Sequence, residues 1–239
     1  MQNKVIILSG GLDSTILAYD IVNQFSAENV FALTFEYGQK HKIELEKAKL
    51  TCSKLGINHK IININFLGEI SKGMCALIGD SELAIPSIKE VLGDPQPVTT
   101  VPYRNMILAS IGLAYAETIE ADEVYLGLQT HDILGYWDCS DDFVWALNNI
   151  SKLNRRHQIE INAPFSNLSK YDEILIGQKL NVPFEDTHTC YGVDKDGLSC
   201  GNCSSCSERI FAFAKAGFPD PVGYSKDIDW DDLIERLAE

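Results

Sequence analysis

Residues 5–15 read VIILSGGLDST, and this stretch decides the fold. An apolar run rich in β-branched residues ends at Ser9-Gly10-Gly11, and the residues that follow place apolar side chains at helical spacing. Short β-branched runs favour buried strands, and glycine allows the tight turn that joins a strand to a helix. The stretch therefore predicts a strand, a glycine-rich loop and a helix in immediate succession.

The same alternation continues through the first half of the chain. Further apolar runs predict strands at residues 30–35, 59–64 and 123–127. Helical spacing predicts helices at residues 43–55 and 105–119. Strands that alternate with helices are typical of a parallel sheet covered on both faces, so the sequence predicts a doubly wound α/β fold. Ligands of such folds bind at the carboxyl ends of the strands.

Two segments interrupt this alternation. Residues 66–100 are rich in Gly and Pro and predict an insertion or a lid. After about residue 160, a helix near residues 169–180 and a cysteine-rich stretch follow. We therefore expect an α/β domain at residues 1–160 and a helical, cysteine-rich segment at residues 161–239.

The composition is that of an acidic globular protein. Lys and Arg total 20 against 34 Asp and Glu, so the formal net charge is −14. This charge argues against a nucleic acid as the main substrate, because phosphate backbones bind clustered cations. No apolar run approaches the roughly 18 residues that span a bilayer, and the N-terminus lacks the long apolar region of a signal peptide. The sequence therefore predicts a cytoplasmic protein with no membrane partner.

The loop at residues 9–15 predicts a phosphate site. Its glycines let backbone N–H groups approach an anion, and the positive end of the following helix points at the same place. The hydroxyl groups of Ser9, Ser14 and Thr15 add donors. The loop lacks the Lys of a Walker A motif. The alternative is a glycine turn that only caps a helix.

Four of the seven cysteines predict a metal site. They stand near the C-terminus with the spacing Cys190-x9-Cys200-x2-Cys203-x2-Cys206. Four thiolates at this spacing can close a tetrahedral zinc site with no open position, which is typical of structural zinc. An iron–sulfur cluster is one alternative, because close Cys-x-x-Cys runs also bind clusters, and free or redox-active thiols are the other. The odd number of cysteines argues against a disulfide framework.

Further motifs accompany the loop and the cysteines. They are FEYGQKH at residues 35–41, VPYRN at 101–105, GLQTHDILGYWDC at 127–139, Lys170, and THTCY at 187–191. The loop resembles the PP-loop of N-type ATP pyrophosphatases, whose pattern is Ser-Gly-Gly-x-Asp-Ser. Taken together, the motifs resemble the QueC family of 7-cyano-7-deazaguanine synthases from about Val5 to Pro221.

The resemblance implies an adenine nucleotide alpha hydrolase-like fold and an ATP-dependent carbon–nitrogen ligase that releases AMP and pyrophosphate. It implies that 7-carboxy-7-deazaguanine and ammonia form the nitrile, a queuosine precursor, through an adenylated acid and an adenylated amide. ATP is the implied co-substrate, with Mg²⁺ beside it and a structural Zn²⁺ on the cysteines. The resemblance also implies a homodimer.

The resemblance assigns residues to the site as well. The expected catalytic residues are Asp13, Arg104 and Lys170, with Arg104 as a clamp for phosphate or carboxylate and Lys170 stabilising the transferred phosphate. The expected ATP-binding residues are Ser9, Gly10, Gly11, Leu12, Asp13, Ser14, Thr15, Thr34 and Phe35. The expected substrate-binding residues are Tyr37, Gln39, Arg104, Asn105, Asp132, Tyr136 and Asp138. Simpler interpretations are a surface ion pair for Arg104, a solvated helix position for Lys170 and an acidic solvent loop at residues 132–138.

One residue departs from the family pattern. Tyr103 stands where the family usually has Gly, and a bulky side chain beside Arg104 can narrow or reshape the acceptor pocket. Two other functions therefore stay open. One is a QueC-like adenylating ligase that joins a deazapurine acid to another amine, even one on a protein; the other is a nucleotide-binding zinc module without catalysis. A tRNA-modifying PP-loop enzyme is disfavoured by the net charge.

Overall fold

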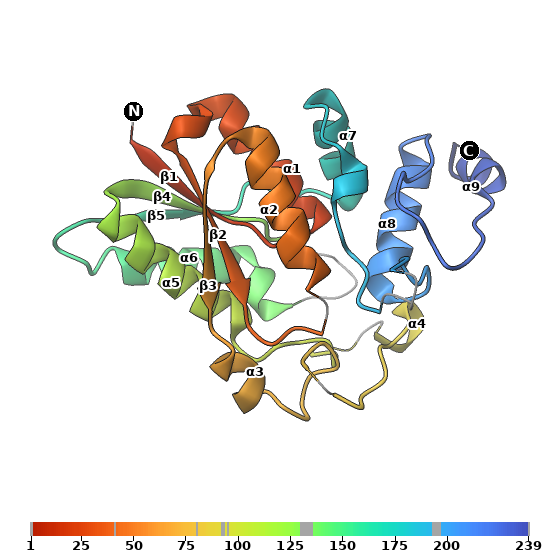
Figure 1. Cartoon of the computed structure of the whole chain (residues 1–239), viewed down its shortest axis with the longest axis horizontal. Coiled ribbons are helices and arrows are strands. Elements are labelled where there is room, and N and C mark those ends of the chain that lie inside the picture. Colours follow the sequence, from red (N-terminus) through yellow and green to blue (C-terminus); the bar gives the residue numbers. More distant parts are fainter. Residues whose placement is uncertain are drawn as a thin grey trace.

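A computed structural model of the chain describes residues 2–40, 42–79, 81–91, 94, 96–129, 136–192 and 197–238. Its centre is a parallel sheet with the strand order β3-β2-β1-β4-β5 (Figure 1). The strands are β1 (Asn3–Ile7), β2 (Val30–Glu36), β3 (Asn58–Asn63), β4 (Ala121–Leu126) and β5 (Glu160–Asn162). The predicted doubly wound parallel sheet is confirmed.

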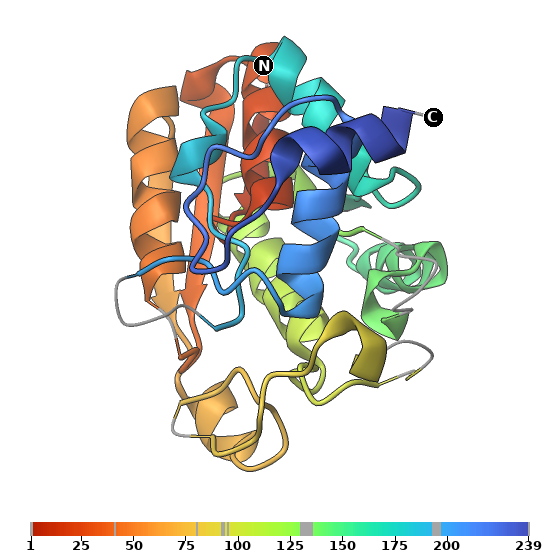
Figure 2. The ribbon, with the colours of Figure 1, turned by 90° about the vertical axis from the view of Figure 1, so that its right-hand side faces the viewer.

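Helices cover both faces of this sheet. One face carries α1 (Leu12–Phe25), α2 (Ile43–Leu55), α7 (Lys170–Lys179) and α8 (Ser204–Lys215). The other carries α3 (Phe66–Ile70), α5 (Arg104–Thr118) and α6 (Asp141–Ser151). The remaining elements are α4 (Ile88–Val91), α9 (Trp230–Ala238) and the 3₁₀ turns η1 (Ala27–Asn29), η2 (Trp137–Cys139) and η3 (Phe184–Asp186). Helix α9 packs against α8 (Figure 2).

The central strand β1 is buried on both faces, which explains why its last three residues, 5–7, are all apolar. Val5 belongs to the core under α5 and α6, and Ile6 belongs to the core under α1 and α8. Both side chains are fully buried. Successive side chains of this apolar run therefore contribute to the hydrophobic cores on the two opposite faces of the sheet.

The position of β1 also locates the site. The chain passes from β1 to β2 and β3 on one side, and later returns to β4 on the other side of β1. The carboxyl ends of β1 and β4 thus form the switch point where doubly wound folds bind ligands. Gly127, directly after β4, packs so closely on the start of α1 that a Cβ there would lie 3.1 Å from Ser14 Cα.

The predicted strands and helices of the first half agree with the structure within about two residues at most ends. Strand β5 and helix α6 were not predicted. β5 has three residues, which is too short for a period-2 pattern, while Ser140 caps α6 by accepting a hydrogen bond from the Phe143 N–H at 3.2 Å. The domain boundary at residue 160 stays a prediction, although α7 and α8 share a hydrophobic core with α1.

The described residues of the 66–100 segment contact the chain just after β2 and reach the cysteine cluster. Gln39 and Ile78 form an isolated antiparallel bridge, and Ser87 forms another with Cys203. A lid function for this segment stays a prediction. Among the described parts of the chain, no helix is both long and apolar enough to cross a bilayer.

Candidate active site

The loop between β1 and α1 is built by contacts that only glycine permits at its centre. Gly10 has φ +84°, and a Cβ there would overlap the backbone oxygen of Glu44 and lie 2.8 Å from the backbone nitrogen of Ala48. The Ser9 N–H donates to Ser14 Oγ at 3.2 Å, and the two hydroxyl oxygens are 2.9 Å apart. The His188 N–H donates to the Gly10 carbonyl at 3.0 Å. The loop is therefore held between α2 and the C-terminal segment.

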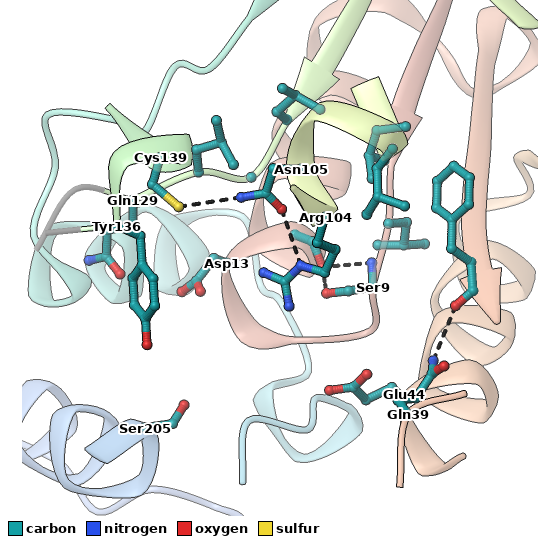
Figure 3. A pocket seen from close by; sticks show the side chains of 18 of the residues that line it. Ser9, Asp13, Gln39, Glu44, Arg104, Asn105, Gln129, Tyr136, Cys139 and Ser205 are labelled. Carbon is teal, nitrogen blue, oxygen red and sulfur yellow. Dashed lines mark hydrogen bonds between the residues drawn. The ribbon is translucent and has the colours of Figure 1, made fainter. Parts of the chain in front are cut away.

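A cavity of about 280 Å³ opens at this loop, at the carboxyl ends of β1, β2 and β4. Ten of the residues predicted for the site line it: Ser9, Asp13, Ser14, Phe35, Tyr37, Gln39, Arg104, Asn105, Tyr136 and Lys170. They come from five separate motifs of the sequence. The structure thus brings together the loop, the motif after β2, the start of α5, Tyr136 of the motif at residues 127–139, and Lys170 at the start of α7. Figure 3 shows several of these side chains around the cavity.

Asp13 and Lys170 form an ion pair on the cavity wall. Lys170 Nζ lies 2.8 Å from Asp13 Oδ1 and 3.0 Å from Oδ2, and only 6% of Lys170 is exposed. Burial opposes the ammonium charge, yet Asp13 and Glu173 raise the pKa of Lys170 above its usual value. Burial also opposes the Asp13 carboxylate, but the charge of Lys170, hydrogen bonds from Glu173 and Lys170, and the charge of Arg209 together lower the Asp13 pKa below its usual value. The pair is therefore charged at neutral pH.

Glu173 lies behind this pair and is fully buried. Burial and the neighbouring Asp13 charge raise the pKa of Glu173 well above its usual value. Neither of its carboxyl oxygens accepts a hydrogen bond from a described residue. Two adjacent carboxylates disfavour each other's charge, so Glu173 holds a proton more tightly than Asp13 does.

Arg104 begins α5 and faces the cavity near Glu44 and Tyr37. Burial opposes its charge, but Tyr37 and Asp138 keep the Arg104 pKa above its usual value. Burial raises the pKa of Glu44 to about 7, with Arg104 acting in the opposite direction. Burial likewise raises the Tyr37 pKa to about 12. The site therefore has a permanent cation beside a carboxyl group that titrates near neutral pH.

Other predicted residues lie elsewhere. Leu12 is in the core, and Thr15 Oγ1 is buried without a hydrogen-bond partner among the described residues. Thr34 Oγ1 donates to the Leu8 carbonyl at 2.7 Å, so this hydroxyl holds β2 to β1. Asp138 is 5% exposed and accepts from the Asn105 N–H at 3.4 Å. It lines a second cavity of about 60 Å³, which shares Arg104 and Tyr136 with the first, while Asp132 lies outside the described residues.

Sequence reasoning missed several residues that line the cavity. They are Glu44, Gln129, Tyr191, Ser204, Ser205 and Glu208. Glu44 lies in the first turn of α2, shortly after the FEYGQKH motif. An acidic residue is favourable at the start of any helix, so its presence there did not indicate a site. The α8 residues fall between and just after two predicted metal ligands. The one sign in the sequence that these residues could line the cavity was their position next to the predicted motifs.

Tyr103 adopts the left-handed conformation, with φ +55°, at the residue before α5. Its ring lies 5.3 Å from that of Trp137 in an edge-to-face arrangement, and 60% of Tyr103 is exposed. Tyr103 lines neither described cavity. The residue that departs from the family pattern therefore turns its side chain to the outer surface.

The four clustered cysteines meet the geometric requirement for a metal site. Their sulfur atoms all lie within 4.8 Å of one another. Backbone N–H groups point at these sulfurs, among them Cys200 N–H to Cys190 Sγ at 3.1 Å and Cys206 N–H to Cys203 Sγ at 3.4 Å. Such donors stabilise thiolates, which are the metal-binding form of cysteine. The donor set fits a metal that prefers four sulfur ligands.

The sheet is parallel, a glycine-rich loop lies at its switch point, and a cavity lined by buried cations opens at that loop. These features define a nucleotide-binding protein of the PP-loop type. Residues 3–217 match the family model described as "Queuosine biosynthesis protein QueC". This chain belongs to the QueC family.

Individual relatives agree with this assignment. A 7-cyano-7-deazaguanine synthase of Caldicellulosiruptor saccharolyticus is 38% identical over 231 residues, which cover 96% of this chain and 99% of the relative. One from a Marinomonas species is 40% identical over 225 residues, which cover 93% and 98%. Among solved structures, the NH3-dependent NAD synthetase of Campylobacter jejuni matches with a TM-score of 0.46 and 20% identity, covering 76% of this chain and 65% of the other.

Proposed function

We propose that this protein uses ATP to convert 7-carboxy-7-deazaguanine and ammonia to 7-cyano-7-deazaguanine, with release of AMP and pyrophosphate. The relatives named 7-cyano-7-deazaguanine synthase support the reaction. The observation that carries the proposal is the shared cavity, in which the loop, the Asp13–Lys170 pair and Arg104 face one another.

The chemistry explains why a single cavity suffices. A carboxylate resists attack by ammonia because oxide is a very poor leaving group. Transfer of AMP from ATP to that oxygen expels pyrophosphate, and ammonia then displaces AMP to form the amide. A second transfer to the amide oxygen, followed by loss of AMP and protons, gives the nitrile. Both steps move the same group onto a similarly placed oxygen, so the protein supplies mainly orientation and charge.

The cavity residues have roles that fit this sequence of steps. The loop N–H groups and the hydroxyls of Ser9 and Ser14 would hold the pyrophosphate, as at other helix N-termini. Lys170 would balance the charge on the transferred phosphate, and Arg104 would clamp the acid. The backbone near Phe35, at the end of β2, would accommodate adenine.

The implied ions fit residues of this chain. Asp13 Oδ1 has an ion-pair partner but no well-directed hydrogen bond, and it would bind Mg²⁺ beside the phosphates. Mg²⁺ there would shield the phosphate oxygens during displacement. The four cysteines would hold Zn²⁺ as a structural ion. We also propose a homodimer, which sedimentation velocity would test.

The direct test incubates purified protein with ATP, Mg²⁺, 7-carboxy-7-deazaguanine and ammonium, and follows the products by mass spectrometry. About two AMP per nitrile are expected from the two adenylations. AMP that appears with an amide but never with a nitrile would contradict the second step. Asp13→Asn is expected to lose AMP formation, and the exposed-residue variant Glu28→Gln serves as its control. Full activity of Asp13→Asn would contradict the placement of ATP.

A further inference from the structure

The second cavity adjoins the main one and is much smaller. Its volume is about 60 Å³, and it shares Arg104, Tyr136, Cys139 and Tyr191 with the main cavity. Three of these shared residues, Arg104, Tyr136 and Cys139, can be followed in Figure 3. A water molecule takes about 30 Å³ in the liquid, so the second cavity has room for one or two molecules of that size and none for a purine base.

The residues around this second cavity carry polar groups with few partners. The Thr100 hydroxyl oxygen is buried and has no hydrogen-bond partner among the described residues. Thr99 Oγ1 and the Tyr136 hydroxyl oxygen lie 3.0 Å apart and share one hydrogen bond. The Asp138 carboxylate is buried, and the described residues donate one side-chain-directed hydrogen bond to it, from the Asn105 N–H at 3.4 Å. Because unpaired buried polar groups cost free energy, these groups point to a small polar molecule in the cavity.

The charges beside the second cavity favour a neutral molecule. Arg104 and Asp138 both line it and carry opposite charges. An ion placed there would be attracted by one of them and repelled by the other, whereas a neutral molecule meets no such conflict. The oxygen atoms of Thr100, Tyr136 and Asp138 can all accept hydrogen bonds. The cavity therefore suits a small neutral molecule that carries several N–H or O–H groups.

The position of the second cavity places its contents beside the reacting carbon. Under the proposed function Arg104 clamps the carboxylate of the acid, and Arg104 lines both cavities. A molecule in the second cavity is then next to the carbon that receives the adenylate. Ammonia must reach this carbon while bulk water is kept away, because water would hydrolyse the adenylated acid.

We propose that the second cavity is the ammonia site, in which the oxygen atoms of Thr100, Tyr136 and Asp138 accept hydrogen bonds from the three N–H groups. The nitrogen lone pair then faces the main cavity. The nitrogen forms a bond to the adenylated carbon, the bond from that carbon to the AMP oxygen breaks, and one proton passes from the nitrogen to the phosphate of the departing AMP. This inference rests on the proposed function and locates its second substrate.

The test separates the step that uses ammonia from the steps that do not. Thr100→Val removes the hydroxyl with little change of shape and is expected to raise the KM for ammonium by about 3–10-fold. Exchange of pyrophosphate into ATP in the presence of the acid needs no ammonia, and we expect it to be unchanged. Conversion of the amide to the nitrile consumes ATP but no ammonia, and its rate is also expected to be unchanged. Thr100→Ser keeps a hydroxyl and is expected to recover most of the affinity for ammonium.

A second variant and two matched controls accompany this measurement. Asp138→Asn is expected to raise the KM for ammonium by about 10-fold, because hydrogen bonds to a charged group are the stronger ones. Thr118→Val changes the last residue of α5, and Asp142→Asn changes an exposed residue in the first turn of α6. Neither residue lines a described cavity, so both controls are expected to keep the wild-type KM for ammonium.

Equal melting temperatures show that each variant is folded. If the wild type makes no AMP from the acid, the proposed function fails. If the wild type makes the nitrile and folded Thr100→Val and Asp138→Asn keep its KM for ammonium, the inference about the second cavity is overturned while the proposed function stands. An equal loss by Thr100→Val in the ammonia-dependent and amide reactions would show that its hydroxyl only supports the shape of the site, and would also overturn the inference.

Discussion

Gly10→Ala is a sharp test of how the loop is built. A Cβ at residue 10 meets two separate penalties. The first is the left-handed conformation at φ +84°, which costs an L-residue about 1–2 kcal/mol. The second is overlap with the backbone of α2 at Glu44 and Ala48, which cannot be relieved by rotating a side chain. Overpacking of this kind costs about 1–3 kcal/mol, so the loss of stability is about 2–5 kcal/mol.

Gly73→Ala provides the matched control. Gly73 has a similar φ of +79°, but a Cβ there would find no atom within 4 Å. This variant therefore carries only the conformational penalty, about 1–2 kcal/mol. The difference between the two variants isolates the contact between the loop and α2.

The assay is urea unfolding at 25 °C, together with pyrophosphate release. Gly10→Ala is expected to lose about 1–3 kcal/mol more than Gly73→Ala, and to lose pyrophosphate release because the displaced loop no longer presents its N–H groups. Gly73→Ala is expected to keep normal activity. Equal free energies of unfolding for the two variants would refute the reasoning about loop packing.

Three further perturbations test other parts of the structure. Burial raises the pKa of Glu44 to about 7 in the folded protein, so the contribution of the protonated Glu44 to stability is complete at a pH below the usual glutamate pKa and is lost as the pH rises through 7. In urea unfolding at pH 5 and pH 8, Glu44→Gln is therefore expected to gain stability relative to the wild type at pH 8. The same difference in unfolding free energy at both pH values would contradict this. Asp220→Ala leaves the Arg209 guanidinium buried without its partner and is expected to cost about 3–5 kcal/mol in calorimetry, whereas the double variant with Arg209→Met recovers most of the loss. Removal of the metal with a strong chelator, followed by elemental analysis, is expected to release about one zinc ion per chain and to lower the melting temperature of the protein. Iron in place of zinc, or an unchanged melting temperature, would contradict the assignment of a structural zinc ion.

The sequence predicted the sheet and the loop because both depend on neighbouring residues. The apolar run before Ser9 and the glycines after it are local signals, and the alternation of strands and helices predicts a parallel sheet with ligands at the carboxyl ends of its strands. The strand order, which places β4 beside β1, came only from the structure. Arg104 and Lys170 were predicted through the family motifs, and they line the same cavity as the loop although 66 residues separate them. Their roles stay predictions until the variants are measured.

The part of the cavity lining that comes from α8 could not be predicted in the same way. Ser204, Ser205 and Glu208 carry no pattern of their own, and they reach the cavity because α8 packs beside α7 and α1 in a shared core. Asp138 shows the opposite case. Its place after β4 suggested a contact with the base of the substrate, yet it lines the second cavity, and its carboxylate accepts from the backbone at the start of α5. Proximity in sequence to a strand end therefore locates a site without saying which side chains face it.

A protein with a net charge of −14 holds two anionic substrates under this scheme, and the arrangement of charges explains how. Lys170 is nearly buried, and Asp13 keeps it protonated. Arg104 lines the same cavity, so two cations face the place where AMP would be transferred. The cations that would bind the two anions are therefore concentrated in one cavity, and the excess of acidic residues over the rest of the chain does not oppose binding there, because solvent and salt screen charges that lie more than about 10 Å away.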